Sequence, residues 1–194
     1  GSNSSYIFNY RYSTLGLLSS MLPEDAENTK YQDLSFKLNF PTKSAGVFSL
    51  WGVGLIDRSG QKAETDPSKW EYMQDKEDQD VKQYMGAFGL NHKLRVWNNA
   101  TLKTTLATTV SGLDMHTERM DANVKPIPQN LIKSTNWNFV FASSLNKKYS
   151  RIHTNKTGIR ATGLKYNLLL KEATHQQPMN TITDESGFSS LLSA

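Results

Sequence analysis

In the first half of the stretch from Tyr31 to Leu55 the sequence alternates apolar and polar side chains with a period of two. The apolar positions, and the polar positions between them, are Leu34, Phe36, Leu38 and Phe40, and Ser35, Lys37 and Asn39. This period is that of a β-strand with two different faces. The break PTKSAG then turns the chain into a second apolar run. The stretch predicts two antiparallel strands whose apolar side faces either a soluble core or lipid.

Similar segments recur along the whole chain and predict about seven strands. They cover residues 5–13, 31–40, 46–57, 82–96, 101–115, 134–146 and 156–171. Short connections favour antiparallel pairing between consecutive strands. We therefore expect an all-β fold, an antiparallel up-and-down meander without a long helix, in one unit that covers residues 1–194.

Within single strands the large apolar side chains share one phase. These sets are Tyr6, Phe8, Tyr10 and Tyr12; Tyr84, Phe88, Leu90 and Leu94; Leu102, Leu106 and Val110; Trp137, Phe139, Phe141 and Leu145; and Leu164, Tyr166, Leu168 and Leu170. Polar residues are predicted to line the opposite face, among them Lys37, Asn39, Asn91, Lys93, Lys103, Thr105, Thr109, Asn136 and Asn138. The orientation of the segment 46–57 is ambiguous because it is apolar on both faces and rich in glycine.

The predicted connections alternate between long and short. Long ones cover residues 14–30, 58–81 and 116–133, short ones cover 41–45, 97–100 and 147–155, and the polar stretch HQQPMNTITDESG follows the seventh strand. Outer-membrane barrels have short turns at one end and longer loops at the other. Several predicted strands also reach the 9–11 residues or so that a tilted strand needs to cross a bilayer. Both features favour a partial transmembrane β-barrel.

Aromatic residues near the predicted strand ends agree with a membrane boundary, where Trp and Tyr are enriched. They are Tyr31, Tyr84, Trp97 and Tyr149. The alternative is a lipocalin-like or sandwich domain, in which the same alternation faces a soluble core.

Composition excludes several classes of protein. Hydrophobic residues make up 37% of the 194, and no run approaches the 18 or so apolar residues of a transmembrane helix. The absence of cysteine excludes a disulfide scaffold, a thiolate metal site and a cysteine nucleophile. The net charge of +4 comes from scattered basic residues, which argues against a nucleic-acid partner.

No catalytic or metal-binding motif is present in the sequence. His92, His116, His153 and His175 lack metal-ligand spacing. The acidic run Asp75–Asp80 has the oxygen ligands that calcium prefers but lacks the glycine and final glutamate of an EF-hand, so a solvated loop tip is the better interpretation. We predict no enzyme activity, no cofactor and no metal site.

Two blocks of the sequence resemble a known family. FNYRYSTLGLLSSM and YQDLSFKLNFPTKSAGVFSLWGVG are similar to the early barrel strands of TonB-dependent outer-membrane receptors, especially those with a carboxypeptidase-regulatory-like domain ahead of the plug. KQYMGAFGLNHKL and LKYNLLLKE fit the same pattern. The apolar residues of STLGLLSSM (13–21) indicate a loop helix that either folds over the barrel rim or helps to form a substrate site, and simple packing is the preferred interpretation.

The resemblance implies part of a barrel in the bacterial outer membrane that imports a nutrient of unknown identity. Its partners would be outer-membrane lipid and the TonB energy-transducing system, which acts through a plug that this sequence does not contain. The stretch SSLLSA also lacks the terminal aromatic residue of such barrels. We therefore expect an internal piece that is inactive alone, with segments 5–13 and 156–171 as unpaired edges of an open sheet.

Overall fold

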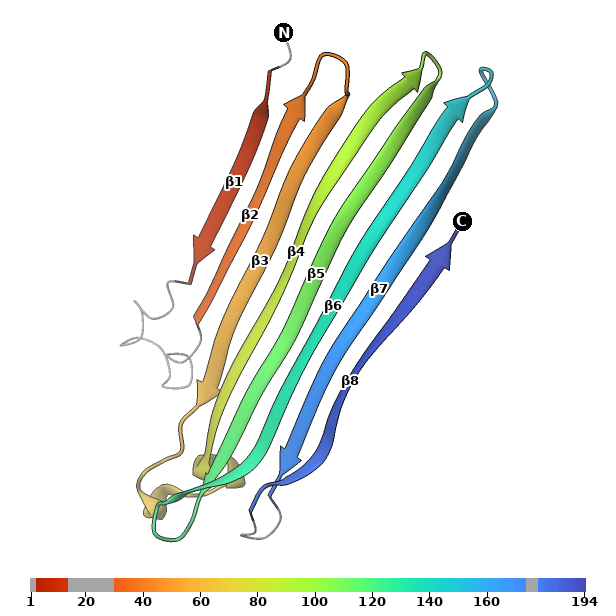
Figure 1. The fold of residues 1–194 in the computed structure, drawn as a ribbon. Coiled ribbons are helices and arrows are strands. Elements are labelled where there is room, and N and C mark those ends of the chain that lie inside the picture. The colour runs from red at the N-terminus through yellow and green to blue at the C-terminus, as the bar shows by residue number, and fades with distance from the viewer. Residues whose placement is uncertain (1–2, 14–29, 174–177) are drawn as a thin grey trace.

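One antiparallel sheet of eight strands, ordered as in the sequence, makes up the fold (Figure 1). The computed structural model describes residues 3–13, 30–173 and 178–194. The strands are β1 Ser5–Tyr12, β2 Lys30–Pro41, β3 Val47–Gln61, β4 Glu77–Trp97, β5 Ala100–Met120, β6 Pro126–Lys148, β7 Thr154–Glu172 and β8 Asn180–Ser193. The predicted all-β antiparallel meander is confirmed. The helix expected at 13–21 lies outside the described residues, apart from Ser13.

The sheet contains one strand more than the sequence predicted. β8 follows the seventh predicted strand and includes much of the polar stretch HQQPMNTITDESG, in which no strand was predicted. Its sequence, NTITDESGFSSLLS, contains Asp, Asn and Gly, which are depleted in strands. Pairing with β7 along most of its length supplies the order that local propensity does not.

The predicted long connection at 116–133 is wrong. β5 continues to Met120 and β6 begins at Pro126, so only residues 121–125 form the turn. β6 begins with Pro126 and contains Pro128, although proline cannot donate to a ladder. They are tolerated because the β6–β7 ladder begins only at Asn130, so these two residues pair on one side alone.

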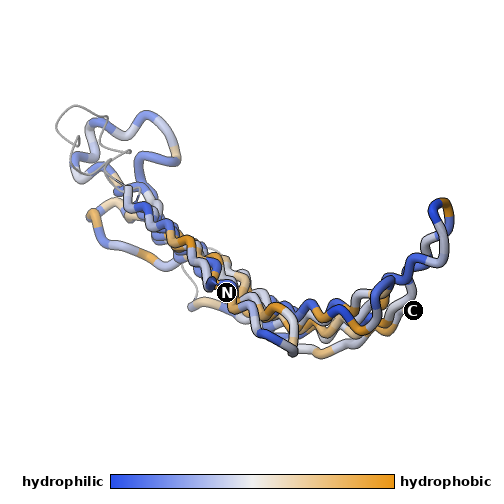
Figure 2. The backbone as a smooth tube through the Cα atoms, turned by 90° about the horizontal axis from the view of Figure 1, so that it is seen from above, coloured by the Kyte–Doolittle hydropathy of each residue, from blue (hydrophilic) through white to orange (hydrophobic). Residues whose placement is uncertain are grey.

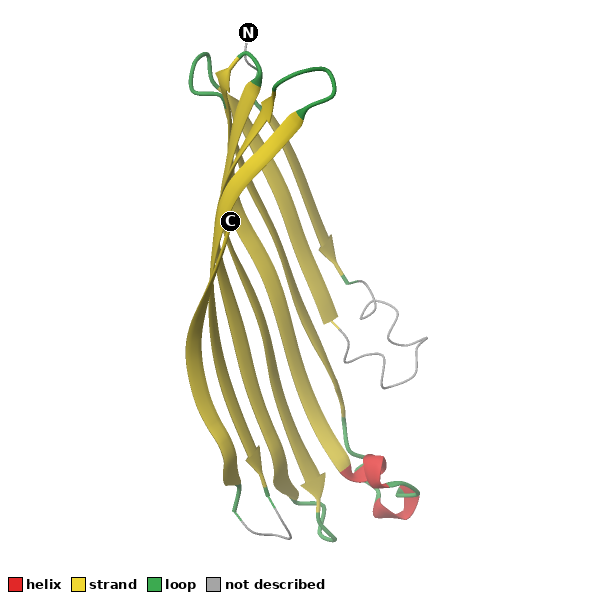
Figure 3. Cartoon of the chain, turned by 90° about the vertical axis from the view of Figure 1, so that its right-hand side faces the viewer, coloured by secondary structure: helices red, strands yellow, loops and turns green. Residues whose placement is uncertain are grey.

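The described connections are short at one end of the sheet, where residues 42–46, 98–99 and 149–153 join the strands. At the other end the longest described connection covers residues 62–76. It contains the 3-10 turns η2 (Pro67–Lys69) and η3 (Met73–Lys76), which stand out to one side of the strand ends in Figure 3. The described residues contain no α-helix. The predicted asymmetry between the two ends therefore rests on this connection, since most of the segment 14–30 is not described.

The sheet is a single bent layer, and no second layer covers either face in the described ranges (Figure 2). Within those ranges no large side chain is fully buried, and the buried apolar residues are Ala100 and Ala173. Phe139, in the middle of β6, is 46% exposed. A soluble domain buries such residues in its core, whereas here Leu34, Phe40 and Phe141 are exposed as well.

Both edges of the sheet are open among the described residues. β1 pairs with β2 alone and β8 with β7 alone. The predicted lack of a ladder between the segments 6–12 and 159–170 is confirmed. The prediction that residues 156–171 form the second edge is wrong, because β7 lies between β6 and β8.

Candidate membrane-facing surface

Strand register divides the sheet into two chemically different faces. Residues directly opposite each other in an antiparallel pair point to the same side of a sheet. One row can thus be followed across all eight strands: Phe8, Phe36, Gly52, Phe88, Thr108, Phe139, Gly163 and Ser190. The next row consists of Tyr6, Leu38, Leu50, Leu90, Leu106, Phe141, Ala161 and Leu192. We call this side the apolar face.

The opposite side, called here the polar face, carries every residue that the sequence assigned to it. The register aligns Lys37, Asn39, Asn91, Lys93, Lys103, Thr105, Thr109, Asn136 and Asn138 on this side. Several of them are joined across strands by hydrogen bonds. The Oγ of Ser49 donates to Asn39 at 2.7 Å, and the Oγ1 of Thr105 donates to Asn91 at 2.9 Å. The predicted common polar surface is confirmed.

The apolar residues of β7 share one phase as predicted, but they point to the other side of the sheet from those of β4 to β6. Leu164 lies opposite Asn138 and Tyr166 lies opposite Asn136, so the apolar residues of this strand point to the polar face. Alternation within one strand shows which residues share a side, and only the hydrogen-bonded register shows which side it is. The polar face is also not uniform on β3, where Trp51, Val53 and Leu55 form an apolar patch.

Glycine and aromatic residues pack against each other on the apolar face. The ring of Phe36 lies over Gly52, its partner on β3, and a side chain at position 52 would collide with it. The ring of Tyr84 covers Gly112 on β5 in the same way. Its hydroxyl reaches Oγ1 of Thr135 on β6 at 3.0 Å. Gly52, one of the glycines that made the segment 46–57 ambiguous, therefore leaves the space that an aromatic ring from a neighbouring strand occupies.

A band on the apolar face is bounded by polar and aromatic residues at both ends. Towards the long connection, the row after Tyr84 contains Arg58 and Lys82. Towards the short turns, the ammonium group of Lys147 lies over the rings of Trp97 and Tyr149, 5.6 Å and 4.8 Å from their centroids. Such belts mark the two interfaces of a bilayer.

The height of the band agrees with that of a membrane. From Tyr84 to Leu94 the strand advances about 33 Å, which at a tilt of 35–45° covers about 23–27 Å. The apolar band of outer-membrane barrels is about 25 Å tall. Lys165 is an exception, since it lies opposite Trp137 one row inside the boundary. A lysine so close to the edge can extend its ammonium group to the interface.

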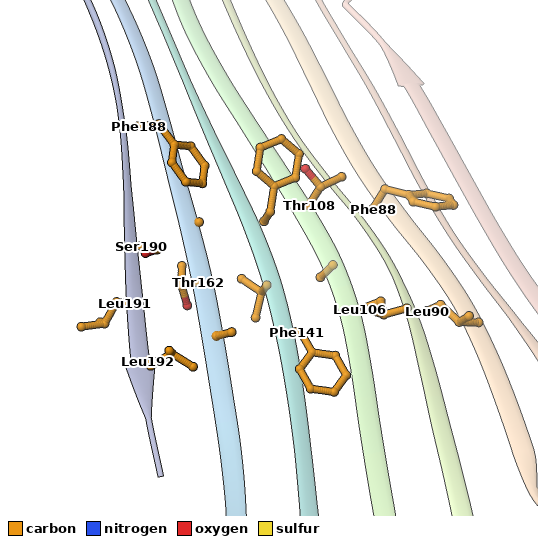
Figure 4. A pocket seen from close by; sticks show the side chains of 15 residues that line it. Phe88, Leu90, Leu106, Thr108, Phe141, Thr162, Phe188, Ser190, Leu191 and Leu192 are labelled. Atoms are coloured by element: carbon orange, nitrogen blue, oxygen red, sulfur yellow. The ribbon is translucent and has the colours of Figure 1, made fainter.

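A shallow hollow of about 680 Å³ lies on the apolar face (Figure 4). Its side chains come from several neighbouring strands and include Phe88, Leu106, Phe141 and Phe188. The hollow is open to the outside. It therefore belongs to the exposed apolar surface and is not an enclosed ligand cavity.

Tyr31 does not belong to the aromatic boundary that the sequence predicted. It lies opposite Asp57 and on the same side as Asp33, on the polar face. Tyr84, Trp97 and Tyr149 do occupy boundary positions. Strands β4 to β6 continue well beyond the row of Tyr84, so this boundary does not coincide with the strand ends, where the sequence placed it.

The connection 62–76 is held in shape by its own side chains. The indole N–H of Trp70 donates to the carbonyl of Glu64 at 2.7 Å, and Lys76 lies over the Trp70 ring. The Asp66 carboxylate accepts hydrogen bonds from the hydroxyl and the backbone N–H of Ser68, which lower the pKa of Asp66. The fold therefore presents an ordered platform at this end of the sheet.

The acidic run Asp75–Asp80 is not the solvated loop tip that was predicted. Asp75 accepts the backbone N–H groups of residues 71 and 72, Glu77 pairs with Arg119 at 2.7 Å, and residues 77–80 begin β4. No group of three or more possible metal ligands occurs among the described residues. His92 stacks on Phe48, with the ring centroids 4.3 Å apart.

Comparison with known proteins adds no relative. No protein-family model matches the chain, and no curated protein or solved structure matches it. The similarity to TonB-dependent receptors stays a prediction from the sequence. In the part of the chain that the structure describes, no helix is both long enough and apolar enough to cross a membrane.

Proposed function

We propose that this chain forms part of the wall of a transmembrane β-barrel. The observation that carries the proposal is the register, which gathers aromatic and aliphatic side chains from eight strands into one exposed band. Its estimated height matches the apolar layer of an outer membrane. The apolar face would contact lipid, and the polar face would line the lumen.

The open edges support a larger barrel. In lipid every backbone N–H and C=O needs a partner, so a spanning sheet has to close on itself. β1 and β8 do not pair with each other. Closure therefore requires strands other than the eight described.

The more specific proposal is a TonB-dependent receptor of the bacterial outer membrane that takes up a nutrient, and we assign no catalytic role to it. It rests on the sequence resemblance. The exposed platform at 62–76 and the polar face would contribute to an outer vestibule. The full-length protein is expected to bind the periplasmic domain of TonB in a pull-down. A full-length protein that does not bind this domain would contradict this part of the proposal.

The wall proposal is tested by Phe139→Arg, with Asn138→Arg as a matched control one residue away on the other face. An arginine on the lipid face at the bilayer midplane costs about 2–4 kcal/mol, whereas a change on the lumen face costs little. The free energy of folding into bilayers is measured for both variants of the full-length protein by urea titration. Equal stability of the two variants would refute the assignment of faces.

The alternative is a soluble β domain that binds a small ligand in an apolar pocket, and the hollow in Figure 4 is the feature that favours it. Its openness and the absence of a second layer over the described sheet argue against it. The need for detergent distinguishes the two proposals. A wall segment needs detergent to stay dispersed, whereas a soluble domain is monomeric in plain buffer.

A further inference from the structure

Three cationic side chains lie side by side at one border of the apolar band. Lys30 on β2 lies opposite Arg58 on β3, and Arg58 lies opposite Lys82 on β4. Lys30 and Arg58 are exposed, and Lys82 is half-buried. This row, called here the cationic row, lies next to the row of Ile56 and Tyr84, towards the connection 62–76.

Beyond Lys82 the row continues to a carboxylate, that of Asp114. It lies directly opposite Lys82 but forms its ion pair with Lys133 on its other side. None of its three members forms an ion pair with another described residue, whereas Lys133, further along the same row, pairs with Asp114 at 3.9 Å. Asp80 is on the same face one row further out and makes no ion pair with Lys82. Like charges directly opposite each other destabilise a sheet. An anion that lies against the directly opposed pair Lys30 and Arg58 would relieve this repulsion.

We propose that the cationic row binds the phosphate groups of anionic lipids at the edge of the bilayer. The inference rests on the proposed function, because it needs the apolar band to lie in lipid. The row is on the lipid side of the sheet and adjoins the band, which is the level of lipid headgroups. Guanidinium and ammonium groups are the side chains that bind phosphate best. The leaflet concerned is the one nearest the connection 62–76.

The test compares lipid selectivity in full-length protein reconstituted into mixed phosphatidylglycerol and phosphatidylcholine vesicles. Energy transfer from the protein's tryptophans to a labelled lipid of each kind reports which lipid lies against it. Each basic side chain near an anionic surface contributes about fivefold to binding. Wild type should prefer phosphatidylglycerol, and Lys30→Gln/Arg58→Gln/Lys82→Gln should lower the preference by about tenfold or more.

A matched control removes three cations from the polar face, Lys37→Gln/Lys93→Gln/Lys103→Gln. It contains one directly opposed pair, Lys93 and Lys103, and should keep the wild-type preference. An equal loss in both triple variants would overturn the proposal, and so would no loss in the first. Raising the salt from 0.1 M to 1 M shortens the screening length from about 10 Å to about 3 Å, so the preference should disappear in wild type without any substitution.

Insertion into pure phosphatidylcholine vesicles separates this inference from the proposed function. If wild-type protein inserts there but shows no lipid preference in the mixed vesicles, the proposed role of the cationic row is wrong and the proposed function stands. Protein that inserts into neither kind of vesicle would overturn both, because the row would then border no bilayer. Millimolar inorganic phosphate should leave the preference intact, and its loss would identify the row as a site for a free anion.

Discussion

The ring of Tyr84 on β4 lies over Gly112, its direct partner on β5, and fills the space that a Cβ at position 112 would need. The tyrosine hydroxyl continues to Thr135 on β6, 3.0 Å away. One side chain thus contacts two neighbouring strands at the border of the apolar band. In a sheet without a core, such contacts between strands replace the packing that a second layer would supply.

Gly112→Ala should therefore lower the free energy of unfolding of the full-length protein in bilayers by about 1–3 kcal/mol, the usual cost of overpacking. Gly54→Ala is the control, because a Cβ there meets only the carbonyl oxygen of Met85, at 3.9 Å. A urea titration in vesicles measures both. If the two variants are equally stable, the packing of the Tyr84 ring does not require a glycine at position 112.

Alternation in the sequence was sufficient to predict the class of fold and most of the polar face. Lys37 and Asn138 lie on strands far apart in the chain, yet both were assigned correctly because each strand has a clear phase. The sequence could not assign Leu164 and Tyr166, whose side depends on the register set by the turn 149–153. The cationic row was missed for the same reason, since its members are distant in sequence and only pairing brings them together.

Two segments form strands against their local propensity, the start of β6 and the whole of β8, and the physical reasons differ. Proline is rare inside strands, but the missing donors of Pro126 and Pro128 are harmless where β6 pairs on one side alone. β8 contains residues that disfavour strands, and only the exposed edge of β7 orders it. Both are cases in which pairing between strands overrides local preference.

Val124 in the turn 121–125 has a φ of 59°, in the left-handed region that β-branched residues avoid. Val124→Asn should raise the free energy of unfolding by about 1 kcal/mol, because asparagine tolerates this conformation. Val124→Ile keeps the branching and should change little. The measurement is again urea titration in vesicles, and a loss of stability with asparagine would show that the turn is not strained.

Asp121 organises the same turn, and its carboxylate accepts the backbone N–H groups of Asn123 and Lys125 at 2.8 Å and 2.9 Å. These bonds, that from Lys125 foremost, lower the pKa of Asp121 below its ordinary value of 3.8. Because the folded pKa is the lower one, the contribution of the carboxylate is complete above the ordinary pKa. It is lost as the pH falls through the folded value.

Hydrogen exchange at the amide of Lys125 should therefore show less protection once the pH falls below the lowered pKa. Asp121→Asn keeps an acceptor oxygen but removes the titration, so its protection should not depend on pH in this window. A Carbon-13 titration of the Asp121 carboxyl gives the pKa itself. A midpoint equal to that of a short peptide of the same sequence would contradict the hydrogen-bonded turn.

The most direct test of the membrane wall is a cysteine scan of residues 135–145 in β6, since the chain has no cysteine of its own. Each single variant of the full-length protein in vesicles is labelled with a fluorophore, and quenching by lipid-borne and by water-soluble quenchers is compared. We expect quenching from lipid at the odd positions, which include Trp137, Phe139 and Phe141, and from water at the even positions, which include Asn136 and Asn138. Quenching without a period of two, or with the two phases exchanged, would contradict the assignment of the apolar face to lipid.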